Sequence, residues 1–298
     1  MSNAEIPFRK RMEFEYGVAE EVTPMVRRMV VRNPSGFTFH GTNTYIIGRG
    51  RVAVIDPGPV LDEHLEALVG ALEGETVEHI VVTHTHHDHS PGAAPLQNRV
   101  GGTLWGARPR ALPEGTKTTE SIQWDFAPDE ELVDGTVVKG DGWTLESIHT
   151  PGHMSNHMCF ALPEENILFS GDHIMSWNTT IVSPPDGNMR EYFDSLEVCL
   201  GRGEKTFWPA HGPNIPDPEP FTRAYRSHRR MREGEIGRCL NAGLKTIPEI
   251  VERLYTHLPA KMHGAAGRSV FAHLEHMVET GRAKCDGAVT ETALYRPV

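Results

Sequence analysis

Short apolar segments separated by polar turns fill the first two-thirds of the chain. Their short length and their content of Val, Ile and aromatic residues are typical of buried β-strands. The strands predicted in this way cover residues 25–31, 44–47, 51–56, 79–83, 103–106, 136–138, 144–148, 158–161, 167–169 and 206–209.

Longer segments in the same region have apolar residues spaced three or four apart, which indicates amphipathic helices. We expect helices at residues 61–72 and 189–200, and a third directly after Ser90-Pro91. In that third helix Ser90 is the predicted N-cap and Pro91 the first helical residue. Strands joined partly by turns and partly by helices predict two sheets with outer helices.

The proline-rich segment 213–220 is the predicted linker between two domains. Beyond it the pattern becomes helical. The expected elements are helices at 220–241, at 248–255 with Thr246 as the N-cap, and from Pro259 to about 280, then a hairpin over 282–298 that turns near Asp286-Gly287. This order resembles a winged helix. We therefore predict a catalytic domain over residues 1–217 and a winged-helix-like domain over 218–298.

Composition places the chain among folded proteins, with 38% hydrophobic and 23% charged residues. No apolar run approaches the length of a membrane span, and residues 1–17 lack the apolar core of a secretory signal. The four cysteines form no CxxC pair, which fits a reducing compartment. The sequence therefore predicts a cytoplasmic protein that does not associate with a membrane.

The strongest chemical signal is the run HTHHDH at residues 84–89, which follows an apolar strand. His84 and His86 are two residues apart near the strand end, so both side chains can point to the same side. Asp88 and His89 fall in the following turn and can aim at the same point. Neutral imidazoles with a carboxylate are suitable ligands for zinc, and also for iron or manganese.

Three further candidate ligands each come just after a predicted strand. They are His153 in a Pro-Gly-His turn, Asp172 after Ser-Gly, and His211 in Ala-His-Gly. Each residue alone would be an ordinary turn or N-cap residue. Together with the HTHHDH run, they predict one metal site at the edge of the sheets.

Five ordered motifs resemble those of the metallo-β-lactamase superfamily: IDPG at 55–58, HTHHDH at 84–89, PGH at 151–153, SGD at 170–172 and AHG at 210–212. The resemblance implies an α+β fold, a four-layer αββα sandwich with two metal ions at one edge. It implies that His84, His86 and His153 hold the first ion, that Asp88, His89 and His211 hold the second, and that Asp172 bridges them. Asp56 is then the buried carboxylate that supports the ligand loop.

Two cations at such a site would share one water molecule and lower its pKa, so that a bridging hydroxide forms at neutral pH. Asp88 and Asp172 are the predicted catalytic carboxylates, which also offset the charge of two zinc ions. His157, four residues after His153, is a candidate supporting group. His173 and Trp177 follow Asp172 and are candidate lining residues of the substrate pocket.

A closer resemblance extends over nearly the whole chain. Residues 33–35, 41–45, 225–233 and 250–255 are similar to the lactamase-β-like group, which has a C-terminal winged-helix domain and includes an endoribonuclease for single-stranded RNA. Similar N-terminal motifs occur in hydroxyacylglutathione hydrolases and fungal polyketide thioesterases. Residues 173–177 lack the Gly-rich run of the ribonuclease members, which argues against an RNA substrate.

Charge is distributed unevenly along the chain. Residues 218–298 contain 13 Lys and Arg and 9 Asp and Glu, a net charge of +4, so the total of −11 leaves −15 for residues 1–217. An acidic catalytic domain repels polyanions. The arginines between Arg223 and Arg238 could contact RNA phosphates, but without interleaved aromatic residues they fit docking onto the acidic domain better.

Three functions therefore remain open. A hydrolase of a small ester, thioester or lactone is preferred over a metal-dependent endoribonuclease or phosphodiesterase acting on single-stranded RNA. The third is a winged-helix nucleic-acid-binding protein with structural metals, for which the helix after Pro259 carries few basic residues. The expected partner is a small-molecule substrate, and a homodimer is left open.

Overall fold

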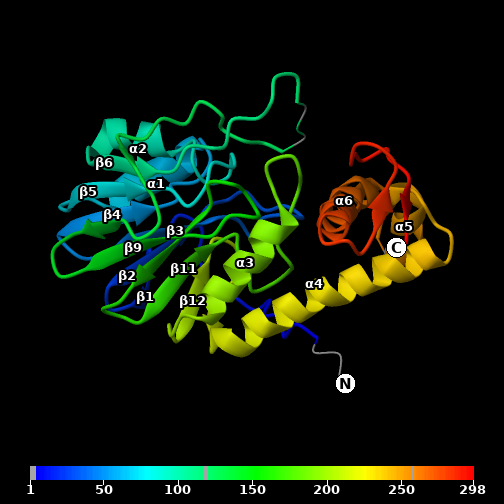
Figure 1. The fold of residues 1–298 in the computed structure, drawn as a ribbon. Coiled ribbons are helices and arrows are strands. Elements are labelled where there is room, and N and C mark those ends of the chain that lie inside the picture. Colours follow the sequence, from blue (N-terminus) through cyan, green and yellow to red (C-terminus); the bar gives the residue numbers. More distant parts are fainter. Residues whose placement is uncertain (1–4, 117, 119, 257) are drawn as a thin grey trace.

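Two β-sheets lie face to face with helices on their outer faces, and a smaller helical domain lies to one side (Figure 1). The computed structural model describes residues 5–116, 118, 120–256 and 258–298. The layered domain is the α+β sandwich that the motifs predict, and the smaller domain follows it along the chain.

The first sheet combines an antiparallel and a parallel half. Its strands, hydrogen-bonded in chain order, are β1 (Glu20–Thr23), β2 (Val26–Val30), β3 (Asn43–Ile47), β4 (Arg51–Ile55), β5 (Thr76–Val81), β6 (Thr103–Gly106) and β7 (Glu130–Glu131). Pairing is antiparallel from β1 to β4 and parallel from β4 to β7. Parallel neighbours need crossover connections, and α1 (Asp62–Ala71) and α2 (Ala93–Val100) provide two of them.

The second sheet has the strand order β13-β12-β11-β10-β9-β8. Its strands are β8 (Val137–Lys139), β9 (Thr144–His149), β10 (Met158–Leu162), β11 (Ile167–Gly171), β12 (Thr206–Pro209) and β13 (Ile215–Pro216). β11 and β12 are parallel and are connected through α3 (Met189–Leu200), while the other neighbours are antiparallel. As a result β9, β11 and β12 run in the same direction and end at the same edge.

Alternation along the strands divides the core into layers. On β4, Val52 and Val54 pack with the helices outside the sheet, whereas Ala53 and Ile55 pack between the two sheets. On β10, Phe160 lies between the sheets and its neighbours Cys159 and Ala161 face the opposite layer. This two-residue period is the geometry of a strand whose two faces are both buried.

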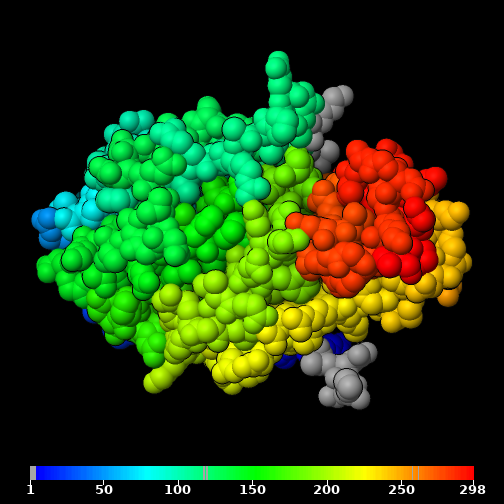
Figure 2. All heavy atoms as spheres, viewed as in Figure 1, coloured from blue at the N-terminus to red at the C-terminus, as the bar shows by residue number. Residues whose placement is uncertain are grey.

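The C-terminal domain is built from helices and a short two-stranded sheet. Its elements are α4 (Pro218–Asn241), α5 (Ile247–Leu254), the 3-10 turn Ala260–Met262, α6 (His263–Glu279), β14 (Lys284–Cys285) and β15 (Tyr295–Arg296). Thr246 caps α5 as predicted, in a capping box with Glu249. Figure 2 shows this domain lying against the larger one, with α4 along the lower edge.

Helix α4 belongs to both hydrophobic cores. Near its start Phe221 and Tyr225 pack into the core of the larger domain, and near its end Ile236 and Leu240 pack into the C-terminal core. The predicted boundary between residues 217 and 218 coincides with the start of this helix, but packing does not separate the chain there. The boundary stays a prediction.

Several arginines of α4 contact protein groups. Arg226 pairs with Glu197 of α3 at 2.6 Å, and Arg223 pairs with Glu219 one turn earlier. Arg229 is buried, donates to the carbonyl oxygen of Thr180 and lies over the ring of Tyr192. The contacts of Arg226 and Arg229 dock the helix onto the acidic domain.

Two local predictions are wrong. The proline-rich linker contains β13, which pairs with β12, because the prolines stand where an edge strand needs no donor. Helix α2 begins at Ala93 with Gly92 as its N-cap, and the Ser90 hydroxyl donates to Gln123 instead. The predicted C-terminal hairpin is present, since β14 and β15 pair antiparallel, and residues 286–294 connect them.

Among the described helices, none combines the length and the apolar character needed to cross a lipid bilayer.

Candidate metal centre

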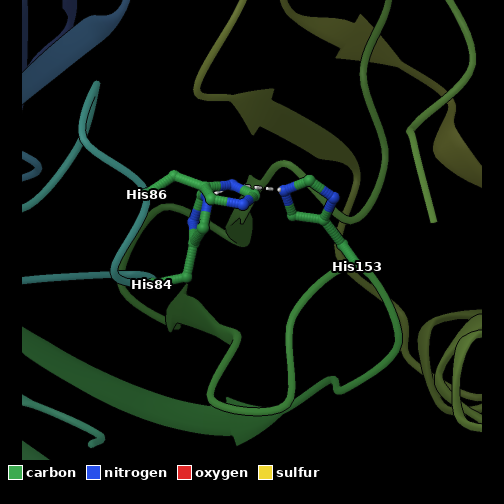
Figure 3. A group of neighbouring side chains, drawn as sticks. All are labelled: His84, His86 and His153. Atoms are coloured by element: carbon green, nitrogen blue, oxygen red, sulfur yellow. Dashed lines mark hydrogen bonds between the residues drawn. The ribbon is translucent and has the colours of Figure 1, made fainter. Parts of the chain in front are cut away.

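The first group of candidate ligands is formed by three imidazoles. His84 and His86 come from the loop after β5, and His153 comes from the loop after β9. His86 Nδ1 lies 3.0 Å from His84 Nε2 and 3.0 Å from His153 Nε2. Figure 3 shows the three rings pointing toward one another. Three nitrogens at one point form the kind of ligand set that holds zinc.

The second group combines one carboxylate with two imidazoles. Asp88 Oδ2 lies 3.5 Å from His89 Nε2 and 3.3 Å from His211 Nε2. His211 comes from the loop after β12, so this group joins the HTHHDH loop of the first sheet to the second sheet.

Asp172, which follows β11, lies between the two groups. Its Oδ2 is 3.7 Å from His153 Nε2 in the first group and 3.6 Å from His89 Nε2 in the second. Its Oδ1 is 3.4 Å from His211 Nε2. The structure therefore brings together the seven predicted ligands, with a single carboxylate in contact with both groups.

The donor atoms fit a pair of divalent cations. His89 Nε2, His211 Nε2 and Asp172 Oδ1 are buried and have no hydrogen-bond partner among the described residues. Buried polar atoms need a partner, and these three face one another across a short distance. Nitrogen and carboxylate donors in this mixture suit zinc, iron or manganese.

Protonation differs between the two groups. Burial lowers the pKa of His86 to about 3 and, together with the neighbouring imidazoles, holds the pKa of His84 well below its usual value. Both rings are therefore neutral at pH 7, which is the form that binds metal. Burial also opposes the protonation of His211, but Asp172 and Asp88 outweigh it and raise its pKa to about 10. A bound cation would replace that proton.

Outer hydrogen bonds fix the orientation of the rings. Asp56 accepts the Thr83 backbone N–H at 2.8 Å and the Thr83 hydroxyl at 2.7 Å, and its Oδ2 lies 2.9 Å from His89 Nδ1. His153 Nδ1 lies 2.6 Å from the carbonyl oxygen of Ile181, and His211 Nδ1 lies 3.2 Å from that of Gly41. Each acceptor holds a proton on Nδ1 and leaves Nε2 free to face the centre.

His157 lies behind Asp172. The Asp172 backbone N–H donates to His157 Nε2 at 3.0 Å, and His157 Nδ1 lies 2.9 Å from the Thr150 hydroxyl. The ring is completely buried. It therefore contacts the ligand through the backbone, in agreement with a supporting position.

His173 and Trp177, the candidate lining residues, point elsewhere. The His173 ring is fully buried and lies 4.9 Å from the ring of Tyr192, because the chain turns inward directly after Asp172. Trp177 stacks on Phe39 at 4.8 Å. Neither is among the described residues that line the cavity at the ligands. The expectation that they line the pocket is wrong.

A cavity of about 480 Å³ opens in front of the ligands. His86, Asp88, His153 and Asp172 form its polar floor. Its walls combine apolar side chains from several loops, which are Phe37, Pro59, Leu61, Met175 and Ile181, with the polar residues Asn33, Ser35, Thr38, His87 and Ser121. Glu120 and Arg268 complete the wall on the side of the C-terminal domain.

Several residues that support or line the site had no assigned role from the sequence. Asn43 donates to the carbonyl oxygens of Pro209 and Gly212, both at 2.9 Å, and so holds the His211 loop. Thr42 donates to the carbonyl oxygen of Asp88 at 3.0 Å. Both belong to a segment that carried the family resemblance. Glu120 and Arg268 had no such signal, because each approaches the site only through the folding of distant segments.

Comparison with known proteins identifies both parts of the chain. Residues 37–211 match the family model of the metallo-beta-lactamase superfamily, and residues 246–291 match that of the beta-lactamase associated winged helix domain. An atrochrysone carboxyl ACP thioesterase of Aspergillus chevalieri is 31% identical over 80% of this chain and 76% of its own length. A lactamase-like protein of Aspergillus niger is 29% identical over 83% of this chain and 78% of its own length.

A solved structure shares the complete architecture. A beta-lactamase domain protein from Burkholderia ambifaria superposes with a TM-score of 0.79 at 19% identity, over 99% of this chain and 97% of that one. The two family-model matches, over residues 37–211 and 246–291, lie in the sandwich and in the appended C-terminal domain. The chain belongs to the metallo-beta-lactamase superfamily and is a hydrolase of that superfamily.

Proposed function

We propose that the chain is a binuclear zinc hydrolase that acts on a small ester, thioester or lactone. The observation that carries the proposal is the position of Asp172, whose carboxylate contacts two separate groups of ligand atoms. One carboxylate between two such groups can hold a pair of cations together. The thioesterases among the relatives support the reaction class.

His84, His86 and His153 would hold one ion, and Asp88, His89 and His211 the other, with Asp172 shared. When bound, such ions supply Lewis acidity, which activates water at neutral pH and polarises an acyl oxygen. The Asp88 side chain is 29% exposed and that of Asp172 is 10% exposed. Asp88 is therefore better placed to accept a proton from an attacking water molecule at the cavity floor.

The cavity supports an acyl substrate. Phe37, Leu61 and Met175 provide an apolar wall beside the carboxylates of the floor. Apolar walls with a few convergent polar groups are typical of small-molecule sites. An RNA backbone would need a run of exposed basic side chains that pair with no protein group. Arg223 and Arg226 already pair with carboxylates and Arg229 is buried, which leaves the exposed Arg230 and Arg238 as a short run.

A substrate panel tests the proposal. Purified protein is assayed on an acyl-thioester, a lactone, a phosphodiester reporter and a single-stranded RNA oligomer, with and without a chelator. We expect hydrolysis of the thioester or lactone, loss of that activity with the chelator and its return with zinc. Elemental analysis should find about two metal ions per chain, one for each group of ligands.

A matched pair of variants separates ligand loss from general damage. His84→Ala should lose metal and activity, whereas His87→Ala, at the exposed histidine between the ligands, should keep both ions. Cleavage of RNA alone, or thioester hydrolysis that resists the chelator and survives His84→Ala, would contradict the proposed function.

A further inference from the structure

One side chain of the C-terminal domain reaches the cavity in front of the candidate ligands. Arg268 lies on α6 and lines that cavity together with Glu120 of the larger domain. Arg268 Nε lies 3.3 Å from Glu120 Oε1, and the two side chains are 23% and 18% exposed. The pair therefore joins the two domains at the wall of the site.

The second oxygen of Glu120 faces a ligand. Glu120 Oε2 lies 3.6 Å from His86 Nε2, on the opposite side of the ring from Nδ1. His86 Nδ1 is the atom that meets His84 and His153. Contacts thus run from Arg268 through Glu120 to His86 and end at the first group of ligands.

His86 needs the contact with Glu120 for its outer nitrogen, which is the ring nitrogen that faces away from the other ligands. The outer nitrogens of His89, His153 and His211 lie 2.9, 2.6 and 3.2 Å from acceptors, which are Asp56 and two backbone carbonyls. His86 Nε2 is buried and has no hydrogen-bond partner among the described residues. A histidine that binds metal through Nδ1 carries its proton on Nε2, and metal-bound histidines almost always donate that proton to an acceptor.

We propose that Glu120 is the positioning residue for His86 and that Arg268 holds Glu120 in place, so that the C-terminal domain completes the metal centre. An ion pair with Arg268 fixes one carboxylate oxygen and leaves the other directed at His86 Nε2. This inference rests on the proposed metal centre, and it goes further by assigning the appended domain a part in forming it.

A second ion pair across the same interface offers a control. Arg190 of α3 pairs with Glu279 of α6 at 2.7 Å, with side chains 47% and 46% exposed. Like Arg268–Glu120, it joins the larger domain to α6, but it contacts no candidate ligand. Its loss reports on domain docking alone.

The experiment measures zinc affinity and not turnover. The two zinc dissociation constants of the full chain are obtained by competition with a chromophoric chelator at fixed pH. Glu120→Leu, which removes the acceptor, should raise one zinc dissociation constant by about 10- to 100-fold and leave the other unchanged. Glu120→Gln keeps a carbonyl acceptor and should recover part of that loss.

Arg268 acts through Glu120, and this makes its effects non-additive. Arg268→Met should raise the same dissociation constant by about tenfold, which is the lower end of the range for a residue that supports a metal ligand. The double variant Glu120→Leu/Arg268→Met should match Glu120→Leu, because the arginine has no route to His86 without the carboxylate. Arg268→Lys keeps the charge and should lie between wild type and Arg268→Met. Arg190→Met should leave both constants within about twofold.

The outcomes separate this inference from the proposed function. Wild-type protein that takes up no zinc overturns the metal centre itself. Wild-type protein with two zinc ions, but with unchanged constants in Glu120→Leu and Arg268→Met, overturns only the positioning role. An equal loss in Arg190→Met also overturns it, since domain docking would then account for the effect. If Arg268→Met fails to fold, as checked by thermal unfolding of the metal-free chain, Arg268→Lys and Glu120→Gln provide the same comparison.

Discussion

Asp56 shows how strongly the site depends on a residue that is not among the predicted ligands. Its carboxylate holds the start of the HTHHDH loop through Thr83 and orients His89 through Nδ1. It is almost completely buried and has a φ of 49°. Asp and Asn are among the few non-glycine residues that tolerate this left-handed region, so Asp56→Asn changes the charge and keeps the backbone conformation.

We expect Asp56→Asn to weaken zinc binding at the second group by about 10- to 100-fold, because an amide cannot accept three hydrogen bonds as the carboxylate does. Chelator competition measures this. Asp129→Asn is a suitable control, since Asp129 accepts the Leu104 backbone N–H in the same sheet without contacting a ligand. If Asp56→Asn binds zinc with the affinities of the wild type, the supporting role of Asp56 is contradicted.

At the scale of elements, the sequence predicts the segments that have a clear apolar pattern and misses short edge strands that lack one. The predictions for 103–106, 189–200 and 206–209 match β6, α3 and β12 at both ends. β7 is missed because its two glutamates are exposed and make no apolar pattern. An edge strand of this kind is recognised only through its hydrogen bonds. The ligands were predictable for a related reason, since each follows a strongly patterned strand, whereas Glu120 and Arg268 follow from tertiary packing alone.

The junction between α4 and α6 depends on a buried carboxylate. Glu233 of α4 is 3% exposed, and it pairs with His276 of α6 and with Arg282, each at 2.6 Å. Burial tends to raise the pKa of Glu233, but hydrogen bonds from His276 and Arg282, with the His273 ring 3.6 Å away, outweigh it and lower the pKa well below its usual value. The ionised form therefore stabilises the folded state.

We expect Glu233→Gln to lower the free energy of unfolding at pH 7 by about 2 kcal/mol, since a buried charge-assisted hydrogen bond is lost and the partly exposed Arg282 can turn to solvent. A carboxyl group whose pKa is lowered by folding stabilises the folded state at pH values above its ordinary pKa of 4.5. This contribution is lost as the pH falls from 4.5 toward the pKa in the folded state. Urea unfolding at several pH values measures the difference. A penalty that stays constant from pH 7 to pH 3 would contradict the assignment.

Across the whole molecule, contacts at separate places tie the two domains together. Helix α4 contributes to both cores, Arg226 pairs with Glu197, Arg190 pairs with Glu279, and Arg268 pairs with Glu120 at the cavity wall. Domains joined only by a flexible linker unfold independently. A shared helix and a shared wall of the site predict that these two unfold together.

Metal removal tests this coupling. Ligands that bind only the folded state stabilise it by about 4 kcal/mol at a free concentration 1,000-fold above Kd, and each kcal/mol shifts the Tm of a chain of this size by roughly 2 °C. We therefore expect a chelator to lower the Tm by about 8 °C or more in a single calorimetric transition, and added zinc to restore it. If the C-terminal domain completes the metal centre, the Tm of that domain must also fall when the metal is removed. Two separate transitions, of which only one shifts with the chelator, would show that the appended domain folds independently of the metal centre.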